Sequence, residues 1–333
     1  MQIKIDLTTL WNQYVARGLV KNSFQDKFDR QLEAGVRLAA GGPELYIIDL
    51  STGTDICPPP QLKKLDNGME LQFTPVASLK PSTPPTGFGR QADLSAEAIA
   101  CRLACQDRTN PLSILNREPV VHLKLSNSEW RAVPNVAPWE RRGHLLWVPT
   151  KLPGEFMSLP HRPQMLNGSF VEDFLEIGLS DEKMITFFTS LHAGASANHI
   201  HFQSIYREAP LAAQFADRFT LGRYTVLKGY AASGLVFPRE VQASILWQPI
   251  EKIQTAGYPF NMIMLANGIY VFVRKPEHEI VEEFPGRPLG AIEFAGHINT
   301  ADQNDFARVT PEVIESAYAK STLDYATLAK VLG

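Results

Sequence analysis

The feature that most constrains the fold of this chain is a short alternation of polar and apolar residues. His199, His201 and Gln203 occupy every second position, and Ile200 and Phe202 stand between them. Side chains of a β-strand point to opposite faces with a period of two. A strand would therefore place two imidazoles and a carboxamide on one face and bury the apolar residues on the other. A helix would scatter the three polar groups around its axis, so we expect a strand.

The residues just before this alternation are small. Gly194, Ala195, Ser196 and Ala197 lead into His199. Small residues let a ligand come close to the backbone. We therefore expect a phosphate group to approach this run, with Ser196 and the backbone at Gly194 among its contacts.

The same reading along the chain predicts strands in the middle and helices near both ends. The pair Asn267-Gly268 between two apolar runs is a strong hairpin signal. Predicted strands cover 45–50, 71–73, 120–125, 130–136, 143–149, 184–188, 260–265, 269–274 and 291–298. Predicted helices lie in 7–40, 94–105, 170–177 and 311–332, and 211–219 is helical or irregular. Segment 132–149 with His199 and His201 is echoed by 260–274 with His297, which suggests a duplicated half.

Length and composition limit the class of protein. The chain has 333 residues, 44% of them hydrophobic and 20% charged, enough for two domains or one large sheet-based body. A formal net charge of -3 argues against a protein that coats nucleic acid. No secretory signal is visible, and no apolar run approaches the ~20 residues of a membrane-spanning helix. We expect a cytoplasmic protein that binds neither nucleic acid nor membranes.

The cysteines indicate the same compartment. Three cysteines are too few, and odd in number, for a disulfide framework, which fits a reducing cytosol. Cys101 and Cys105 lie one helical turn apart in the predicted helix 94–105. This spacing alone is little support for a zinc site, so we interpret both as buried small apolar residues.

The central stretch has the residues for nucleophilic catalysis. Neutral imidazole, with a pKa of about 6.5, can attack phosphorus at pH 7 without a separate base. In this interpretation His201 attacks, Gln203 donates to the phosphate oxygens, and His199 supports the attacking ring. A His-x-His pair on a strand also binds metals, so a metal site on His199 and His201 stays open as an alternative.

The pattern Gly194-x-Ser196-x-x-His199-x-His201-x-Gln203 resembles the signature of the transferase branch of the histidine-triad (HIT) superfamily. That branch includes galactose-1-phosphate uridylyltransferase, diadenosine tetraphosphate (Ap4A) phosphorylase and the GDP-hexose phosphorylases. The motif is most similar to GDP-L-galactose and GDP-D-glucose phosphorylase, because the Pro between the two histidines of the uridylyltransferases is absent. Segments 135–149 and 292–298 resemble other strands of these phosphorylases, so the resemblance spans roughly 115–320.

The resemblance implies an α+β fold, a HIT-like, mostly antiparallel sheet with flanking helices. It implies two HIT-like halves, as in galactose-1-phosphate uridylyltransferase. Residues 1–206 would carry the His-x-His-x-Gln motif, and residues 207–333 would pack against them. A homodimer is an open alternative for the assembly.

The resemblance also implies a nucleotidyltransferase of the phosphorylase type. His201 would become a nucleotidyl-histidine, and inorganic phosphate would accept the nucleotidyl group. We expect a nucleoside diphosphate sugar as substrate, GDP-hexose first, with Ap4A phosphorolysis as the nearest alternative. Alternatives from another class are a metal-binding protein and a nucleotide-binding protein without activity.

Further site residues follow from the same comparison and from their positions after strands. Asn135 would lie near the ribose or base. Lys151 and Arg274 could balance phosphate charge, and His297 could approach from the second half. The family's Asn upstream of the motif is absent here, so its contact with the phosphate or leaving group is either lost or supplied by Thr189 or His192.

The resemblance implies no required cofactor. In the uridylyltransferases the residue that matches His199 can bind zinc together with a Cys-x-x-Cys pair. This chain lacks that pair, which argues against zinc but leaves it as an alternative.

Overall fold

The protein is described here from a computed structural model. The described residues are 4–16, 36–41, 44–49, 60–74, 103, 105, 113–114, 119–135, 140, 143–151, 161–284, 287–300 and 302–333. Cys101 and most of the predicted helix 94–105 lie outside these residues.

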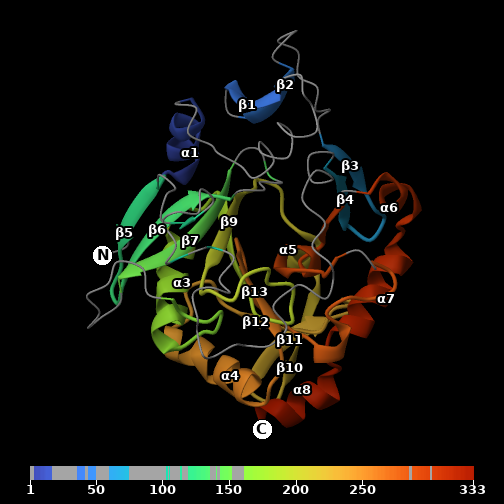
Figure 1. The fold of residues 1–333 in the computed structure, drawn as a ribbon. Coiled ribbons are helices and arrows are strands. Elements are labelled where there is room, and N and C mark those ends of the chain that lie inside the picture. Colours follow the sequence, from blue (N-terminus) through green and yellow to red (C-terminus); the bar gives the residue numbers. More distant parts are fainter. Residues whose placement is uncertain are drawn as a thin grey trace.

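A ten-stranded sheet in which all neighbouring strands are antiparallel forms the centre of the protein (Figure 1). From one edge to the other the strands are β10 (Asp217–Leu221), β11 (Tyr224–Lys228), β12 (Gly234–Phe237), β14 (Gly268–Val273), β13 (Phe260–Leu265), β8 (Met184–Thr189), β9 (Phe202–Tyr206), β7 (His144–Lys151), β6 (Glu129–Pro134) and β5 (Val121–Lys124).

The sheet contains the same strand order twice. One set runs β5-β6-β7-β9-β8, the other runs β10-β11-β12-β14-β13, and β8 pairs with β13 where the sets meet. Along the chain, a helix follows the third strand of each set: α3 (Gly168–Ser180) follows β7, and α4 (Ala243–Thr255) follows β12. The predicted echo is therefore misaligned, because 260–274 corresponds to β8 and β9 rather than to 132–149. The division at residues 206 and 207 stays a prediction; it lies between β9 and β10.

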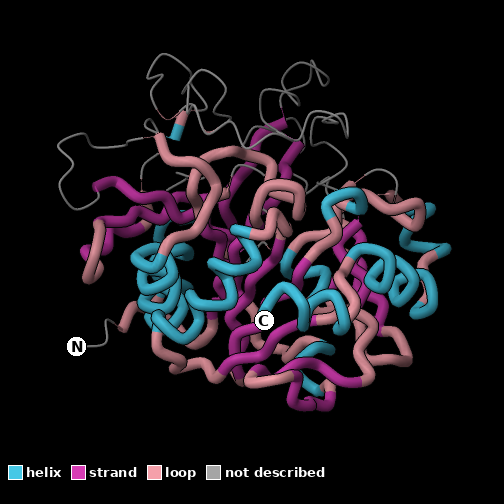
Figure 2. Tube along the Cα trace, turned by 90° about the horizontal axis from the view of Figure 1, so that it is seen from below, coloured by secondary structure: helices cyan, strands magenta, loops and turns pink. Residues whose placement is uncertain are grey.

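The other elements lie around this sheet. They are α1 (Leu7–Ala16), the paired strands β1 (Val36–Gly41) and β2 (Glu44–Asp49), the three-stranded sheet of β3 (Gln61–Lys64), β4 (Glu70–Phe73) and β15 (His297–Thr300), the 3-10 turns η5 (Ala212–Phe215) and η6 (Pro276–His278), and the helices α5 (Ala291–Phe294), α6 (Gln303–Arg308), α7 (Pro311–Ser321) and α8 (Tyr325–Leu332). Seen from below in Figure 2, helices stand in front of the strands.

The large sheet is buried on both faces, which explains why its central strands are apolar throughout. In β13, Met262 and Met264 join the core on the face covered by α3, α4 and α8. Ile263 and Leu265 join the opposite core, to which α5, α7 and the three-stranded sheet contribute. A strand covered on both faces has no polar phase, so its side chains read as a continuous apolar run.

The predicted hairpin between β13 and β14 is confirmed. Gly268 has φ of +153°, and a Cβ there would lie 2.6 Å from the carbonyl oxygen of Phe237. Only glycine fits such a close approach of two backbones.

Two predicted segments are wrong in part. The predicted strand 291–298 begins as helix α5, and strand β15 starts only at His297. Gly296 separates them with φ of +109°, a turn that the apolar pattern of the segment conceals. In the predicted helix 7–40, α1 ends at Ala16 and residues 36–41 form a strand. The strands β10 to β12 and helix α4 were not predicted as elements.

None of the helices in the described part of the chain combines the length and apolar character that crossing a bilayer would need.

A buried carboxyl on α3 makes stability depend on pH. Asp173 is fully buried and accepts hydrogen bonds from Ser128 Oγ and, at 2.9 Å, from Trp130 Nε1. Burial raises the pKa of Asp173 to about 6, although both hydrogen bonds act to lower it.

We predict that Asp173→Asn abolishes one component of this pH dependence. The unfolded carboxyl has a pKa of about 3.9, so the folded state holds the proton more tightly. The contribution of the protonated Asp173 carboxyl to the free energy of unfolding is full below about pH 4 and is lost as the pH rises through 6. Urea unfolding between pH 3.5 and 7 should show this fall in wild type and not in the variant. The exposed-site control Glu251→Gln should keep the wild-type profile; an unchanged profile in Asp173→Asn would contradict the assignment.

Candidate active site

The loop between β8 and β9 carries both histidines of the motif. The predicted strand begins later than expected, because β9 starts at Phe202 and residues 199–201 are not in a strand. The reason is local bonding. The backbone N–H of His201 donates to the side-chain Oε1 of Gln164 at 2.9 Å, and the ring of His201 turns back onto the backbone of His199. His199 and His201 therefore do not share the face of a strand.

The ring of His201 has a defined tautomer. Its Nδ1 lies 2.7 Å from the carbonyl oxygen of His199. A carbonyl oxygen only accepts, so Nδ1 carries the proton. In the neutral ring the lone pair then resides on Nε2, the atom that can attack or bind a metal.

Gln164 holds the loop at both ends. Its Nε2 donates to the carbonyl oxygen of Thr189 at 2.8 Å and to that of His201 at 3.2 Å. With the bond from the His201 N–H, a single buried carboxamide joins the end of β8 to the start of β9. Gln164 was not predicted as a site residue, since no sequence pattern connects it to His201, 37 positions away.

The apolar residues of the alternation are buried as predicted. Ile200 and Phe202 are inaccessible to solvent, and the Phe202 ring stacks on Trp130 with 4.7 Å between ring centres. This packing fixes the chain on both sides of His201.

Gln203 lies in a cluster of three polar side chains. Its Oε1 accepts a hydrogen bond from Asn135 Nδ2 at 3.2 Å and lies 2.9 Å from Nε2 of His144. The structure thus brings the predicted residues Asn135 and Gln203 together. His144, the first residue of β7, was not predicted as a site residue, and it is buried beside Gln203.

Ser196 and Gly194 occupy the loop ahead of the histidines. Ser196 is exposed, and its contact with substrate stays a prediction. Gly194 has φ of +100°, and its N–H donates to Oε1 of Glu279 at 3.2 Å. That N–H is therefore directed at a carboxylate, so the predicted phosphate contact through it is not supported.

Arg274 has a different role from the predicted one. It is fully buried, and its guanidinium donates to the carbonyl oxygens of Leu289 at 2.7 Å and Ala193 at 3.5 Å and to Oδ1 of Asn261 at 3.2 Å. Burial lowers its pKa to about 9. Its donors bind the protein's own carbonyls, so it holds the loop instead of balancing phosphate charge.

His297 also lies away from His201. It is in β15 of the small sheet, where its Nδ1 is 3.1 Å from Oε2 of Glu70 and 3.3 Å from Nη1 of Arg207. Arg207 follows β9 at the end opposite His201, about 20 Å away along an extended chain. The prediction that His297 approaches the site is therefore wrong. His297 belongs instead to an ion-pair cluster around Glu70. Burial acts to raise the pKa of Glu70, but hydrogen bonds from His297 and Arg207 lower it to about 2.

Lys151 is the last residue of β7, and its side chain lies outside the described part of the structure. Its predicted role in balancing phosphate charge stays a prediction.

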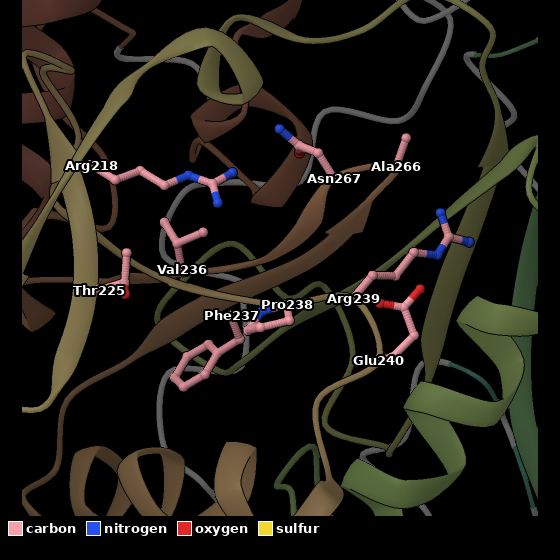
Figure 3. Close-up of a pocket in the computed structure, with 9 residues that line it drawn as sticks. All are labelled: Arg218, Thr225, Val236, Phe237, Pro238, Arg239, Glu240, Ala266 and Asn267. Carbon is pink, nitrogen blue, oxygen red and sulfur yellow. The ribbon is translucent and has the colours of Figure 1, made fainter.

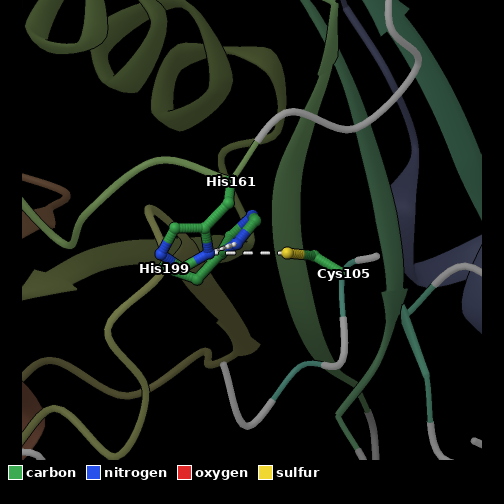
Figure 4. A group of neighbouring side chains, drawn as sticks. All are labelled: Cys105, His161 and His199. Atoms are coloured by element: carbon green, nitrogen blue, oxygen red, sulfur yellow. Dashed lines mark hydrogen bonds between the residues drawn. The ribbon is translucent and has the colours of Figure 1, made fainter. Parts of the chain in front are cut away.

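A cluster of possible metal ligands surrounds His199 (Figure 4). Nδ1 of His161 lies 3.4 Å from Nδ1 of His199 and 3.4 Å from Sγ of Cys105. Ligand nitrogens at the corners of a zinc tetrahedron are about 3.4 Å apart, given Zn–N bonds of about 2.0–2.1 Å. A thiolate and two imidazoles are the donors that zinc prefers. These three residues fit zinc without the Cys-x-x-Cys pair on which the sequence prediction depended.

Comparisons with known proteins identify the fold. No known family profile matches this chain. No curated protein sequence matches it either. The structure is similar to yeast Ap4A phosphorylase Apa2 in complex with Ap4A, with a TM-score of 0.54 at 14% identity over 95% of this chain and 96% of that chain. For Apa2 in complex with AMP the TM-score is 0.54 at 13% identity, over 95% and 94%. This likeness confirms the predicted α+β fold, with a large antiparallel sheet and flanking helices.

We predict that the cluster binds one zinc ion. Protein purified without added metal should contain about one zinc per chain by mass spectrometry, because three suitable donors already lie together. Cys105→Ser should remove most of it, whereas His122→Gln, at an exposed residue of β5, should keep it. Metal-free wild-type protein that also takes up no added zinc would contradict this prediction.

We predict that Arg274→Met lowers the free energy of unfolding by about 2–4 kcal/mol, because it removes the guanidinium hydrogen bonds to the carbonyl oxygens of Leu289, His278 and Glu279. Arg274→Lys should lose less, since it keeps the charge but not the planar fork. Urea unfolding followed by tryptophan fluorescence measures both. The control is Arg223→Gln at an exposed turn; equal stability of Arg274→Met and this control would show that the contacts are not needed.

Proposed function

We propose that the protein is a nucleotidyltransferase of the phosphorylase type that works through a covalent nucleotidyl-His201. The observation that supports this most is the bond from Nδ1 of His201 to the carbonyl of His199, which makes Nε2 the nucleophilic atom. The HIT-like fold, similar to a phosphorylase over nearly the whole chain, adds support.

The first step transfers the nucleotidyl group to the protein. Nε2 of His201 attacks the α-phosphorus, the N–P bond forms, and the bond to the leaving phosphate oxygen breaks. The leaving group departs as a sugar 1-phosphate or a nucleotide. The positive charge that develops on the ring is stabilised by the His199 carbonyl, which accepts from Nδ1–H.

The second step regenerates the imidazole. An oxygen of inorganic phosphate attacks the same phosphorus, the N–P bond breaks, and a nucleoside diphosphate leaves when the nucleotidyl group is a nucleoside monophosphate. Two successive displacements at one site predict ping-pong kinetics.

Gln203 would hold the phosphate during both steps. Asn135 donates to its Oε1 and Nε2 of His144 lies beside the same oxygen, an arrangement that directs the amide NH2 group to the other side. There it would donate to a non-bridging phosphate oxygen. In this proposal Asn135 and His144 position Gln203, Ser196 contacts the phosphate, and Lys151 adds positive charge.

Two substrates fit this chemistry. The motif favours a nucleoside diphosphate sugar such as GDP-hexose. The similarity to a phosphorylase in complex with Ap4A supports a dinucleoside polyphosphate equally well. Offering GDP-hexose and Ap4A together and measuring which nucleotidyl group becomes attached to His201 would decide between them.

The two alternatives from other classes are a metal-binding protein and a nucleotide-binding protein without activity, and the structure bears on them differently. Within the described residues, His199 groups with Cys105 and His161 and not with His201. A metal at His199 is therefore compatible with catalysis by His201. A nucleotide-binding protein without activity remains the contrasting hypothesis, because it would bind nucleotide yet carry no covalent label.

We predict that wild-type protein incubated with α-³²P-labelled GDP-hexose or Ap4A acquires an acid-labile, base-stable label, as expected for a phosphoramidate. His201→Asn should lose the label and at least a thousandfold in turnover, because no other group supplies the nucleophile. His122→Asn, at an exposed position of β5, is the matched control and should keep both. Full turnover of His201→Asn with wild-type stability would overturn the proposal.

A further inference from the structure

The repeated strand order allows the two halves to be aligned residue by residue. In the first half the ladder between β7 and β9 ends at the pair Trp147 and Phe202. In the second half the ladder between β12 and β14 ends at the pair Phe237 and Ile269. Gly268 therefore occupies the position that His201 has in the first half, and the second half has no nucleophile there.

The alignment also identifies the row of residues that passes through Gln203. In the first half, Val133, Leu146 and Gln203 are paired across β6, β7 and β9. The corresponding row across β11, β12 and β14 consists of Thr225, Val236 and Tyr270. This row is therefore where a counterpart of the candidate active site would lie.

A cavity of about 350 Å³ lies there (Figure 3). Thr225 and Val236 of the row line it, together with Arg218 of β10 and Asn267 of the turn before β14. Arg239, just after β12, lines its opposite side.

Two guanidinium groups give the cavity its chemical character. Nη2 of Arg218 donates to Oη of Tyr270 at 3.2 Å, and Nη2 of Arg239 donates to the carbonyl oxygen of Gly178 at 2.9 Å. Each bond orients its guanidinium and leaves other N–H donors of the fork for a ligand. Glu240 is the single carboxylate of the lining, so positive charge prevails here in a chain of net charge -3.

The other residues that line the cavity indicate the chemistry of the rest of the ligand. Val236 and Pro238 supply apolar surface, and Thr225 supplies a hydroxyl. Cavities that hold small ligands measure about 300–1,000 Å³, so this one suits a mononucleotide-sized molecule and is small for a dinucleotide. The two arginines suit an anionic phosphate, and the apolar wall suits a ring. A ligand with both is a phosphate monoester of the size of a nucleotide.

We propose that the second half carries a non-catalytic binding site for such a phosphate monoester, with Arg218 and Arg239 as its anion ligands. The site has the location of the active site in the duplicated fold but lacks its imidazole, so it binds and does not react.

Equilibrium dialysis with radiolabelled AMP and, separately, inorganic phosphate tests this site. Wild-type protein should bind AMP at an arginine-dependent site at least tenfold more tightly than phosphate, because the apolar wall contacts only AMP. Arg218→Gln/Arg239→Gln should weaken this binding at least tenfold. Arg223→Gln, an exposed arginine outside the cavity, should leave it unchanged.

Two further measurements separate loss of the site from loss of the fold. Glu240→Gln should tighten AMP binding two- to threefold, which a misfolded variant would not do. The covalent label on His201 should form as in wild type in all these variants, so failure of the catalytic proposal would be seen separately. AMP binding that is equal in wild type and Arg218→Gln/Arg239→Gln, or phosphate binding as tight as AMP binding, would overturn the inference.

Discussion

One hydrogen bond determines what the central loop can do, the bond from Nδ1 of His201 to the carbonyl of His199. It joins a side chain to the backbone only two residues earlier, so it requires the chain to leave the extended form there. This is why β9 starts at Phe202 and the two histidines point to different neighbours. The tautomer that makes Nε2 nucleophilic and the separate cluster around His199 both follow from this local turn.

Such a turn has to be held from outside, because a loop of small residues has little packing of its own. Gln164 binds it from the first half, at Thr189 and His201. From the second half, Arg274 and Asn261 both donate to the carbonyl of Ala193. The candidate site thus depends on both halves, although its reactive groups come from one. Leaving a buried arginine without its carbonyl partners would cost free energy, so these hydrogen bonds keep the loop attached to the second half.

The sequence predicted what depends on local pattern. The antiparallel hairpin at Asn267-Gly268 and the burial of Ile200 and Phe202 follow from periodicity and turn chemistry, whereas the α+β class was implied by the resemblance of the motif. The positions of His161, His144 and Gln164 could not be predicted, because each meets the motif only through tertiary contacts. Arg274 and His297 were misassigned because their roles also depend on tertiary contacts. A charged residue after a strand, such as Arg274, can face solvent, a ligand or a buried carbonyl with the same sequence pattern, and the pattern around His297 does not show which other elements its strand pairs with.

The duplication explains why the two halves can diverge in chemistry while sharing one sheet. The strand order needs apolar residues on both faces, and these are retained in β8, β9, β13 and β14. The equivalent positions of Gln203 in β9 and Tyr270 in β14 nevertheless differ. There a tyrosine whose hydroxyl contacts Arg218 replaces a carboxamide, and Gly268 replaces a histidine. One fold can therefore hold a reactive phosphate site in one half and an arginine-lined cavity in the other without a change of architecture.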